Sequence, residues 1–389
     1  MFHIADGNDI KEGRLTDIYF ERTKKILRTI GKNPVVKAEV FLKGFPDNYQ
    51  WGILAGIEET IKLLSNANKI SIRCMPEGTV FKDFQPLMVI EGKYLDFGIY
   101  ETAILGFLCQ ASGIATKAAR CKLAAGDKLV YSFGARRIHP AITPMIERNA
   151  FIGGVDGVST TLGAKLIGQQ PVGTIPHALV LILGDTVEAT KAFNQVIEPE
   201  IKRISLIDTF CDEKFEAIRV AESLGEDLSG IRLDTPSSRR GNFKKILEEV
   251  RWELDIRGFN KVKLIVSGGI NEDDILKLKD IVDAFGVGTA ISGAQVLDFS
   301  LDIVEIEGRK ISKRGKMSGA KKVIRCSRCF NDKIVLEDKN ASDYRCENCG
   351  GIYKDVFIEA VKEGEILYDF PQASDIRSNV LNQFKFLEL

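Results

Sequence analysis

Short apolar runs recur along the chain from residue 129 onward, and most of them end in glycine or a small polar residue. They lie at residues 129–137, 150–160, 170–178, 204–210, 229–238, 262–271 and 283–292. Between several of them apolar residues recur at helical spacing, as in residues 212–225, 242–258 and 272–282. Apolar strands that alternate with helices predict a parallel sheet covered on both faces. Seven such units predict an incomplete (β/α) barrel, because a full barrel has eight; an open doubly wound sheet is the structural alternative.

The chain before residue 129 follows a different pattern. Alternation over residues 35–44 predicts a strand, and residues 100–126 form one long helical pattern. Alternation returns at residues 299–308. We therefore predict a mixed α/β protein with four parts: an N-terminal α/β domain over residues 1–115 that is completed by about 296–320, a barrel-like domain over 116–295, a segment over 321–365, and a tail over 366–389.

Composition narrows the class of protein only a little. The 389 residues include 54 Lys and Arg against 54 Asp and Glu, so no overall basic excess favours nucleic acid. The N-terminal residues carry acids and lack the apolar core of a secretory signal. The longest stretch without Asp, Glu, Lys or Arg, residues 166–184, holds two Gln and two Pro and is a poor membrane span. We expect a cytoplasmic protein without a membrane partner.

The ends of the predicted strands carry polar groups. In a parallel barrel the ligand site lies at the carboxyl ends of the strands. A helix cap explains any single Asp or Ser there, but it does not explain polar groups at seven strand ends together. The residues concerned are Arg136, Arg137, Asp156, Thr174, His177, Asp208, Arg232, Asp234, Ser237, Ser238, Ser267 and Thr289.

Glycines mark the last two strand ends, in VSGGI and FGVGT. Gly268, Gly269 and Gly288 would let backbone N–H groups approach an anion, and Thr289 adds a hydroxyl. In barrels the loops after the last two strands commonly bind phosphate, aided by a helix N-terminus. A dinucleotide fingerprint does not fit, because the third glycine, Gly293, comes one residue too late. Tight turns without a ligand are the alternative for either loop alone.

Cations and one histidine suggest chemistry on an anionic ligand. Arg136 and Arg137 form a pair that suits carboxylate or phosphate, and Arg232 with Arg239 and Arg240 adds to it. A structural ion pair is the alternative for any one of them. His177 could act as a general base or a nucleophile, although a lone histidine is more often structural. Asp208 and Asp234 could support Mg²⁺ on a polyphosphate.

These stretches, in their order along the chain, resemble the archaeal-type nicotinate phosphoribosyltransferases. The similarity covers residues 10–320 and extends into the tail, and it rests on TDIYFERT, YETAILGFLCQASGIAT, SFGARRIHPAI, GTIPHAL, LIDTF, RLDTPSSRRGNF, VSGGI and FGVGT. The resemblance implies a type II phosphoribosyltransferase fold, an α/β sandwich domain with an irregular barrel. It implies that nicotinate and phosphoribosyl pyrophosphate (PRPP) are joined with coupled ATP hydrolysis, in a homodimer or higher homo-oligomer.

The same resemblance assigns roles to individual residues. His177 would carry a transient phosphoryl group, and Arg232 and Asp234 complete the predicted catalytic set. Tyr19, from the neighbouring subunit, and Phe133 would stack on the pyridine ring of nicotinate, with Thr174 beside them. Arg232 is the first choice for the nicotinate carboxylate and Arg136 the second. The predicted PRPP contacts are Arg137, Ser237, Gly268, Gly269, Gly288 and Thr289.

Four cysteines in the tail have the spacing of a metal site. Cys326 and Cys329 are separated by two residues, a 16-residue spacer follows, and Cys346 and Cys349 repeat the first spacing. This spacing predicts a Cys₄ zinc site, and four thiolates leave no open position, so the Zn²⁺ should be structural. Disulfides are the alternative, and a cytosolic chain disfavours them.

Two other functions compete with this hypothesis. Quinolinate phosphoribosyltransferase shares the fold, but its second substrate carboxylate calls for a denser cluster of cations. A nucleic-acid-binding zinc ribbon on an inactive barrel would use the basic stretch at residues 309–326. The balanced overall charge and the polar strand ends make nucleic acid an unlikely partner.

Overall fold

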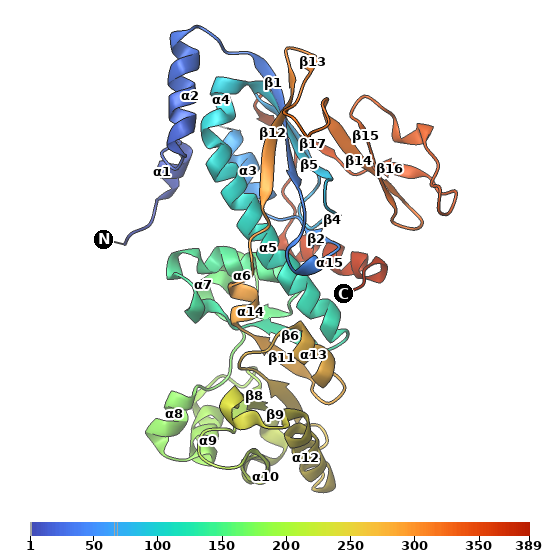
Figure 1. The fold of residues 1–389 in the computed structure, drawn as a ribbon. Helices are drawn as coiled ribbons and strands as arrows, with labels where there is room; N and C mark the ends of the chain where they lie inside the picture. The colour runs from blue at the N-terminus through green and yellow to red at the C-terminus, as the bar shows by residue number, and fades with distance from the viewer. Residues whose placement is uncertain (1, 66, 68) are drawn as a thin grey trace. The chain divides into compact units, whose positions relative to one another are not determined.

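The computed structural model describes residues 2–65, 67 and 69–389. It divides the chain into two compact units, of which unit 1 comprises Met1–Thr116 and Gln295–Glu388 and unit 2 comprises Lys117–Ala294 (Figure 1). The division falls within the longest helix, α5 (Glu101–Ala125). Unit 1 is therefore built from the two ends of the chain, and unit 2 from its middle.

A seven-stranded antiparallel sheet forms the centre of unit 1, in the order β13-β12-β1-β5-β3-β17-β18. Strand β1 lies inside it, and Val36 pairs with Ile306 on one side and with Gly92 on the other. The strands are β1 (Val35–Leu42), β3 (Ser71–Cys74), β5 (Pro86–Lys93), β12 (Phe299–Ile306), β13 (Arg309–Lys310), β17 (Ile358–Lys362) and β18 (Glu365–Ile366). A two-stranded ribbon, β2 (Gly52–Ile53) with β4 (Val80–Phe81), completes the β structure of this part.

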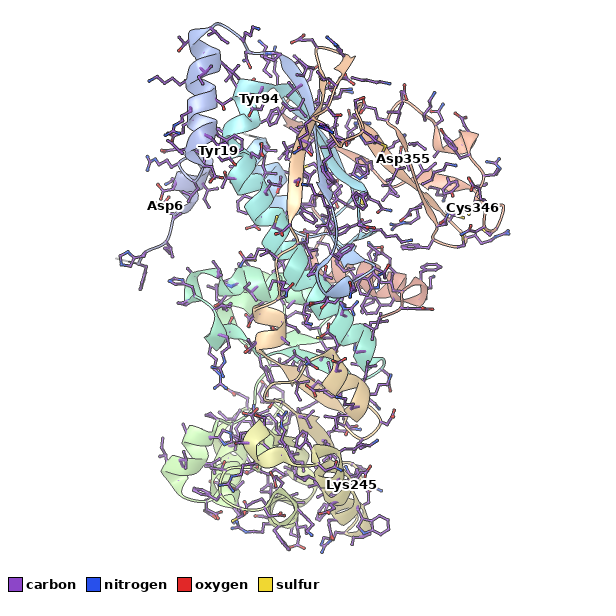
Figure 2. All side chains as sticks on the ribbon, viewed as in Figure 1. Asp6, Tyr19, Tyr94, Lys245, Cys346 and Asp355 are labelled. Carbon is purple, nitrogen blue, oxygen red and sulfur yellow. The ribbon has the colours of Figure 1, made fainter. Side chains whose placement is uncertain are left out.

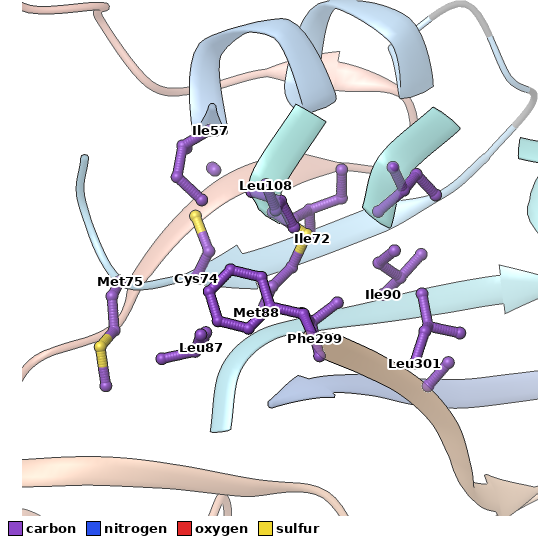
Figure 3. Packing of buried hydrophobic residues seen from close by; sticks show 14 of the residues in the cluster. Ile57, Ile72, Cys74, Met75, Leu87, Met88, Ile90, Leu108, Phe299 and Leu301 are labelled. Atoms are coloured by element: carbon purple, nitrogen blue, oxygen red, sulfur yellow. The ribbon is translucent and has the colours of Figure 1, made fainter. Parts of the chain in front are cut away.

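Helices cover one face of this sheet and bury the main hydrophobic core. Ile57 and Ile61 of α3 (Ile57–Leu64) and Leu108 of α5 pack on the inward side chains of the strands, such as Ile72 (Figure 3). The remaining helices of unit 1 are α1 (Gly7–Lys11), α2 (Ile18–Thr29), α4 (Tyr94–Phe97) and α15 (Ala373–Gln383). The alternation in the sequence accounts for this layer, since successive strand side chains face opposite sides.

The opposite face of the sheet carries the cysteine segment. Its three-stranded sheet has the order β15-β14-β16, built from β14 (Lys321–Cys326), β15 (Asp332–Leu336) and β16 (Tyr353–Asp355). The contact with the large sheet is both apolar and polar. Ala320 packs on Val89 and Val304, Lys321 pairs with Glu39 at 2.9 Å, and Lys37 pairs with Glu337. Burial raises the pKa of Glu39, and Lys321 offsets part of that rise.

One helical stretch, Tyr94–Ala125, is long and apolar enough to cross a membrane by length and composition alone. Half of its most apolar window is buried inside the protein, as expected of a helix that packs in a hydrophobic core. Ile104, Leu108, Ala115 and Ala118 are among its fully buried residues.

Unit 2 contains a six-stranded parallel sheet with helices between successive strands. The sheet order is β7-β6-β11-β10-β9-β8, with β6 (Leu129–Ser132), β7 (Gly157–Val158), β8 (Arg203–Leu206), β9 (Leu228–Leu233), β10 (Lys263–Val266) and β11 (Ala284–Val287). The helices are α6 (Thr143–Ile152), α7 (Thr161–Leu166), α8 (His177–Leu183), α9 (Thr186–Val196), α10 (Glu213–Leu224), α11 (Ser237–Arg240), α12 (Phe243–Ile256), α13 (Glu272–Leu278) and α14 (Thr289–Ser292). The predicted α/β class and incomplete barrel are confirmed, because β7 and β8 are open edges of the sheet.

Two of the seven predicted strands were wrong in part or in full. Residues 150–160 begin inside α6, and only Gly157 and Val158 form a strand. Residues 170–178 contain no strand; Val172 N–H donates to Val158 C=O at 2.8 Å, and α8 begins at His177. Pro171 and Pro176 have no N–H to continue a ladder, which explains why the apolar run stays irregular.

Candidate active site

The carboxyl ends of the six parallel strands meet at one edge of the unit 2 sheet. Parallel pairing brings together the residues that follow each strand, and this is where ligands bind in such sheets. The residues concerned are Phe133 after β6, Ser159 after β7, Asp208 after β8, Asp234 after β9, Ser267–Gly269 after β10 and Gly288–Thr289 after β11.

His177 lies beside two of these strand ends. It is the first residue of α8 and does not follow a strand as predicted. Its Nδ1 lies 3.1 Å from the hydroxyl of Thr209, and its Nε2 lies 3.9 Å from a carboxylate oxygen of Asp208 and 3.7 Å from one of Asp234. The imidazole is therefore held at one nitrogen by a hydroxyl and faces two acids with the other.

Asp208 is the more deeply buried of the two acids in this cluster. Only 2% of its side chain is exposed, and neither carboxylate oxygen makes a well-formed hydrogen bond within the described residues. Burial raises its pKa above the ordinary value, while His177 and nearby backbone amides of Asp234 and Asp208 lower it by less. A buried carboxylate without a hydrogen-bond donor is costly, and such groups are concentrated at functional sites.

Arg232 brings a buried guanidinium to the same place. It lies in β9, opposite Leu206 of β8 and Ile265 of β10 in the sheet register. Its Nε is buried and has no hydrogen-bond partner among the described residues. Burial lowers its pKa, Asp234 and Asp208 raise it, and Arg136 lowers it further. Arg232 thus adds an incompletely paired cation next to the two acids.

An aromatic ring lies at the end of β6. Phe133 is half-buried, and its ring stacks with Tyr131 at 6.1 Å between centroids. Gly286 of β11 makes room for it, because a Cβ at that position would lie 2.5 Å from the Phe133 ring. Phe133 therefore crosses the neighbouring strand at the ligand edge of the sheet.

The loop after β10 has backbone groups that are free to bind an anion. Gly268 and Gly269 have φ values of +83° and +70°, which favour glycine. A Cβ on Gly268 would lie 2.8 Å from Asp234, whereas one on Gly269 would meet nothing within 4 Å. Ser267 donates its hydroxyl to Asp234 at 2.7 Å and so ties this loop to the end of β9.

The helices after these loops contribute less than the sequence suggested. The first turn of α13 contains Glu272, Asp273 and Asp274, and a capping box with Asn271 already satisfies its N-terminus. Helix α14 has only four residues, beginning at the exposed Thr289 after Gly288. Any anion held here is therefore bound by loop N–H groups, hydroxyls and cations rather than by a helix dipole.

The structure places the other predicted site residues in varied surroundings. Arg136 and Arg137 are exposed in a short 3₁₀ turn after Phe133. Ser237 is exposed at the start of α11, and the Thr174 hydroxyl donates to Ile175 C=O at 3.3 Å. Asp156, in contrast, is a structural residue that accepts from Lys122 Nζ at 2.9 Å and from Val130 N–H at 2.8 Å.

Tyr19 belongs to unit 1. It lies on α2, 55% exposed, with its hydroxyl 3.4 Å from Asp17 (Figure 2). Exposed apolar residues continue along the helix at Ile18, Ile26 and Ile30. This leaves Tyr19 available to a partner molecule.

Sequence reasoning missed two residues at this end of the unit 2 sheet and the contacts of a third. Thr209 holds the imidazole and Gly286 admits the Phe133 ring. Arg240 was expected to bind an anion, and the structure shows it bound to backbone oxygens of the glycine loop. The glycine inside the apolar run of β11 was a signal for Gly286, since glycine within a strand often marks close approach of another group.

The four tail cysteines come together as predicted, and Figure 2 shows Cys346 in this segment. Their four sulfur atoms lie within 4.8 Å of one another. The Sγ atoms of Cys326 and Cys349 are 3.5 Å apart, and those of Cys329 and Cys346 are 3.4 Å apart. Both distances are too long for a disulfide bond. Sulfurs bound to one tetrahedral zinc ion at about 2.3 Å would be about 3.8 Å apart, so the geometry fits Zn²⁺.

Comparisons with known proteins agree with this architecture. The N-terminal domain of quinolinate phosphoribosyl transferase matches residues 17–112, and its C-terminal domain matches residues 114–302. The chain is 27% identical to the nicotinate phosphoribosyltransferase of Bacillus subtilis, over 90% of this chain and 84% of that protein.

Solved structures extend the similarity to the whole chain. The nicotinate-nucleotide pyrophosphorylase from Pyrococcus furiosus is 53% identical with a TM-score of 0.97, covering 100% of this chain and 99% of that one. Human nicotinic acid phosphoribosyltransferase shares the fold, with 17% identity, a TM-score of 0.77, and coverage of 96% and 94%.

An antiparallel sheet domain joined to an open parallel barrel with a polar carboxyl edge defines a phosphoribosyltransferase of the quinolinate phosphoribosyl transferase type. Within that class, the chain belongs to the nicotinate phosphoribosyltransferase family. The resemblance found in the sequence is confirmed.

Proposed function

We propose that this enzyme joins nicotinate to PRPP, giving nicotinate mononucleotide and pyrophosphate in the salvage of NAD. The activity named for the relatives supports this reaction. The observation that carries it is the cluster of His177 with Asp208 and Asp234, next to Arg232 and an open glycine loop. The name of the Pyrococcus furiosus relative fits this reaction and the decarboxylating quinolinate reaction equally, because both release pyrophosphate as nicotinate mononucleotide forms.

The chain's own groups suit the chemistry of this transfer. Breaking the bond between ribose C1 and pyrophosphate makes a cationic centre and an anionic leaving group, so the protein must neutralise charge and align the nitrogen nucleophile. Arg232 binds the nicotinate carboxylate and Phe133 stacks on the pyridine ring. Arg137, Ser237, Gly268, Gly269, Gly288 and Thr289 surround the PRPP phosphates.

Asp208 and Asp234 would hold a magnesium ion on the polyphosphate. The unpaired oxygens of Asp208 fit this role, because carboxylate oxygens are the ligands that Mg²⁺ prefers. Bound there, the ion neutralises phosphate charge. Asp234 also keeps the Ser267 loop in place through its 2.7 Å hydrogen bond.

ATP hydrolysis is coupled to the reaction through His177. Nucleophilic attack by an imidazole nitrogen on the γ-phosphorus of ATP gives phosphohistidine and ADP, and water later releases phosphate. Thr209 orients the ring through Nδ1, which leaves Nε2 on the side of the two acids. Such orientation is what a histidine nucleophile needs.

A homodimer completes the nicotinate site. Tyr19 is exposed on the apolar stripe of α2, which suits burial against a second subunit. We expect Tyr19 of one subunit to stack in the site of its partner, opposite Phe133. Mixing Tyr19→Ala and His177→Ala subunits should then restore ATP-stimulated activity, which neither variant has alone; no recovery in mixed dimers would contradict shared sites.

The cysteine segment binds one structural Zn²⁺, and the enzyme acts in the cytoplasm. Metal analysis should find one zinc per chain, and Cys349→Ser should lose it and lower the melting temperature. Retention of zinc in Cys329→Ser, Cys349→Ser double variants would show that the metal binds elsewhere. Zinc binding commonly contributes to the folding free energy of such segments.

One experiment tests the reaction itself. The protein is incubated with PRPP, Mg²⁺ and nicotinate, nicotinamide or quinolinate, with and without ATP, and the products are identified by mass. Nicotinate mononucleotide from nicotinate supports the proposal; the same product with release of CO₂ from quinolinate alone favours the quinolinate enzyme. Tight, salt-sensitive binding of duplex nucleic acid without any turnover would favour the zinc-ribbon alternative.

A second experiment tests the histidine. His177→Ala should abolish both the stimulation by ATP and an acid-labile phosphoenzyme. His139→Ala is the matched control, because His139 is exposed and its Nδ1 only accepts from Ala141 N–H at 3.2 Å. ATP stimulation that persists in His177→Ala would rule out the phosphohistidine.

A further inference from the structure

Arg240 makes an unusual set of contacts for a cation beside a phosphate loop. Its Nε donates to Thr235 C=O at 2.6 Å, and its Nη2 donates to Ser267 C=O at 2.9 Å and to Gly268 C=O. No carboxylate lies within ion-pair distance of it in the part of the chain that the structure describes. The guanidinium therefore connects the loop after β9 with the loop after β10 entirely through backbone oxygens.

These contacts determine the direction of two peptide groups. The described chain has no cis peptide bond, so each N–H points away from the C=O of its own peptide unit. Because one nitrogen of Arg240 binds the carbonyls of Ser267 and Gly268, the N–H groups of Gly268 and Gly269 point to the opposite side. Neither N–H has a hydrogen-bond partner among the described residues. Successive N–H groups aimed to one side form a concave anion site.

The same contacts limit what Arg240 can bind directly. Nε and Nη2 are committed to three carbonyls, so only Nη1 keeps free donors. A bidentate contact with phosphate needs two neighbouring nitrogens and would break bonds to the loop. The sequence interpretation, in which Arg239 and Arg240 both bind a ligand anion, stays a prediction, and these contacts leave only Nη1 of Arg240 for such binding.

We propose that Arg240 is a positioning residue, which turns the N–H groups of Gly268 and Gly269 toward a phosphoryl group of PRPP without contacting it. This inference rests on the proposed function, which supplies the phosphorylated substrate. Both glycines are exposed, and an added Cβ on Gly269 would meet nothing within 4 Å, so a ligand can approach the loop there. The chemistry that this loop recognises is a phosphate or pyrophosphate oxygen.

Arg251 is a matched control for Arg240, because it binds backbone carbonyls at the start of β10, whereas Arg240 binds those after its end. Arg251 donates to Phe259 C=O at 2.9 Å and to Val262 C=O at 2.7 Å, just before β10 begins at Lys263. Arg251→Lys and Arg240→Lys therefore both lose bonds to backbone carbonyls and keep the same charge. They loosen different loops, and Arg251→Lys also weakens an ion pair with Asp255 at 2.7 Å.

The test measures PRPP and nicotinate binding by calorimetry, with steady-state kinetics alongside. Arg240→Lys should raise the Kd and the KM for PRPP by roughly 10- to 100-fold, the usual effect of a displaced binding group, and leave nicotinate affinity unchanged. Arg240→Met should raise the Kd and the KM for PRPP as much as Arg240→Lys does, because neither side chain has the planar guanidinium that binds three carbonyls. Arg251→Lys should bind PRPP like the wild type while losing a similar amount of thermal stability.

Each other outcome has a definite meaning. Equal PRPP affinity in Arg240→Lys and Arg251→Lys, or recovery in Arg240→Lys relative to Arg240→Met, overturns the positioning role. A wild-type protein that binds no PRPP and forms no mononucleotide defeats the proposed function instead. Should Arg240 variants not fold, ¹⁵N-glycine NMR of the wild type decides: the amide signals of Gly268 and Gly269 must both shift on adding PRPP, and unshifted signals refute the inference.

Discussion

The two edges of the parallel sheet in unit 2 differ sharply in how their polar groups are paired. At the edge where strands begin, Arg203 is buried and donates to Asn194 Oδ1 and to the carbonyls of Ile197, Glu198 and Ile201. Asp283 accepts from Lys263 Nζ at 3.0 Å and from Leu264 N–H at 2.9 Å. At the edge where strands end, Asp208 and Arg232 are buried with unpaired atoms.

The difference separates stability from function within one sheet. Paired groups hold the strands and loops together, whereas unpaired buried groups cost folding free energy and, at the end of the sheet where ligands bind, are available to a ligand. Arg240 differs from Asp208 and Arg232 at this end of the sheet, because its Nε and Nη2 donate to three backbone carbonyls of the two loops.

The largest effect on stability is expected from Arg203→Met. The substitution leaves several buried carbonyls without a donor, and we expect a loss of at least about 3 kcal/mol in the free energy of unfolding. Denaturant unfolding measures it, and the folded fraction should keep near-normal kcat/KM. A loss below about 1 kcal/mol would mean that the paired groups where the strands begin do not stabilise the sheet as proposed.

Arg232→Met is the mirror experiment at the second edge. Because Arg232 is already buried with an unpaired Nε, methionine should change the unfolding free energy little. We expect kcat/KM for nicotinate to fall roughly 10²- to 10³-fold, as when one preorganised charge-stabilising donor is removed. Normal turnover, or a loss of stability as large as that of Arg203→Met, would contradict the separation of the two edges.

Asp208→Asn should stabilise the protein while reducing its activity. Burial raises the pKa of Asp208, so its ionisation opposes folding, and the stability of the wild type falls as pH rises from the ordinary value of 3.8 through the folded value. Asparagine does not titrate, so the variant should be more stable than the wild type at pH 7 and gain little at pH 4. Thermal unfolding at both pH values measures the difference in stability between the variant and the wild type. A difference that becomes smaller as the pH rises would contradict a raised pKa of Asp208.

The smallest effect is expected from Asp283→Asn at the first edge. The side-chain oxygen can still accept from Leu264 N–H, and only the partly exposed pair with Lys263 is lost. We expect a destabilisation of about 0.5 kcal/mol, most of it removed by high salt, and an unchanged kcat/KM. A drop in kcat/KM would show that a change where the strands begin affects the site where they end, which the hydrogen bonds do not predict.

Much of the fold follows from the pattern of apolar residues. Alternating strands in unit 1 and apolar strands in unit 2 appear where the sequence predicts them, because burial on one face or two determines those patterns. The run at residues 170–178 failed because two prolines cannot join a ladder, although its apolar character resembles that of a strand. The prediction for residues 150–160 was also wrong in part, because α6 extends to Ile152 and β7 is short.

The site was predictable in residue type but not in geometry. Polar residues after β8, β9 and β10 were visible in the sequence, since strand ends of a parallel sheet share one edge. The side-chain directions were not: Arg239 and Arg240 are neighbours with the same chemistry, yet Arg239 is exposed and Arg240 binds three carbonyls. Asp156 shows the reverse, a polar residue of the right kind that faces Lys122 at the other edge.

The discontinuity of unit 1 has a consequence for synthesis of the chain on the ribosome. Unit 2 is one continuous segment and can fold as soon as residue 294 has emerged, whereas β1 must wait for β12. Until then one edge of β1 is unpaired, and an open strand edge is a site of aggregation. A chain released before residue 306 would thus contain the complete parallel sheet of unit 2. Its unit 1 sheet would lack β12 and would be prone to aggregate through the open edge of β1.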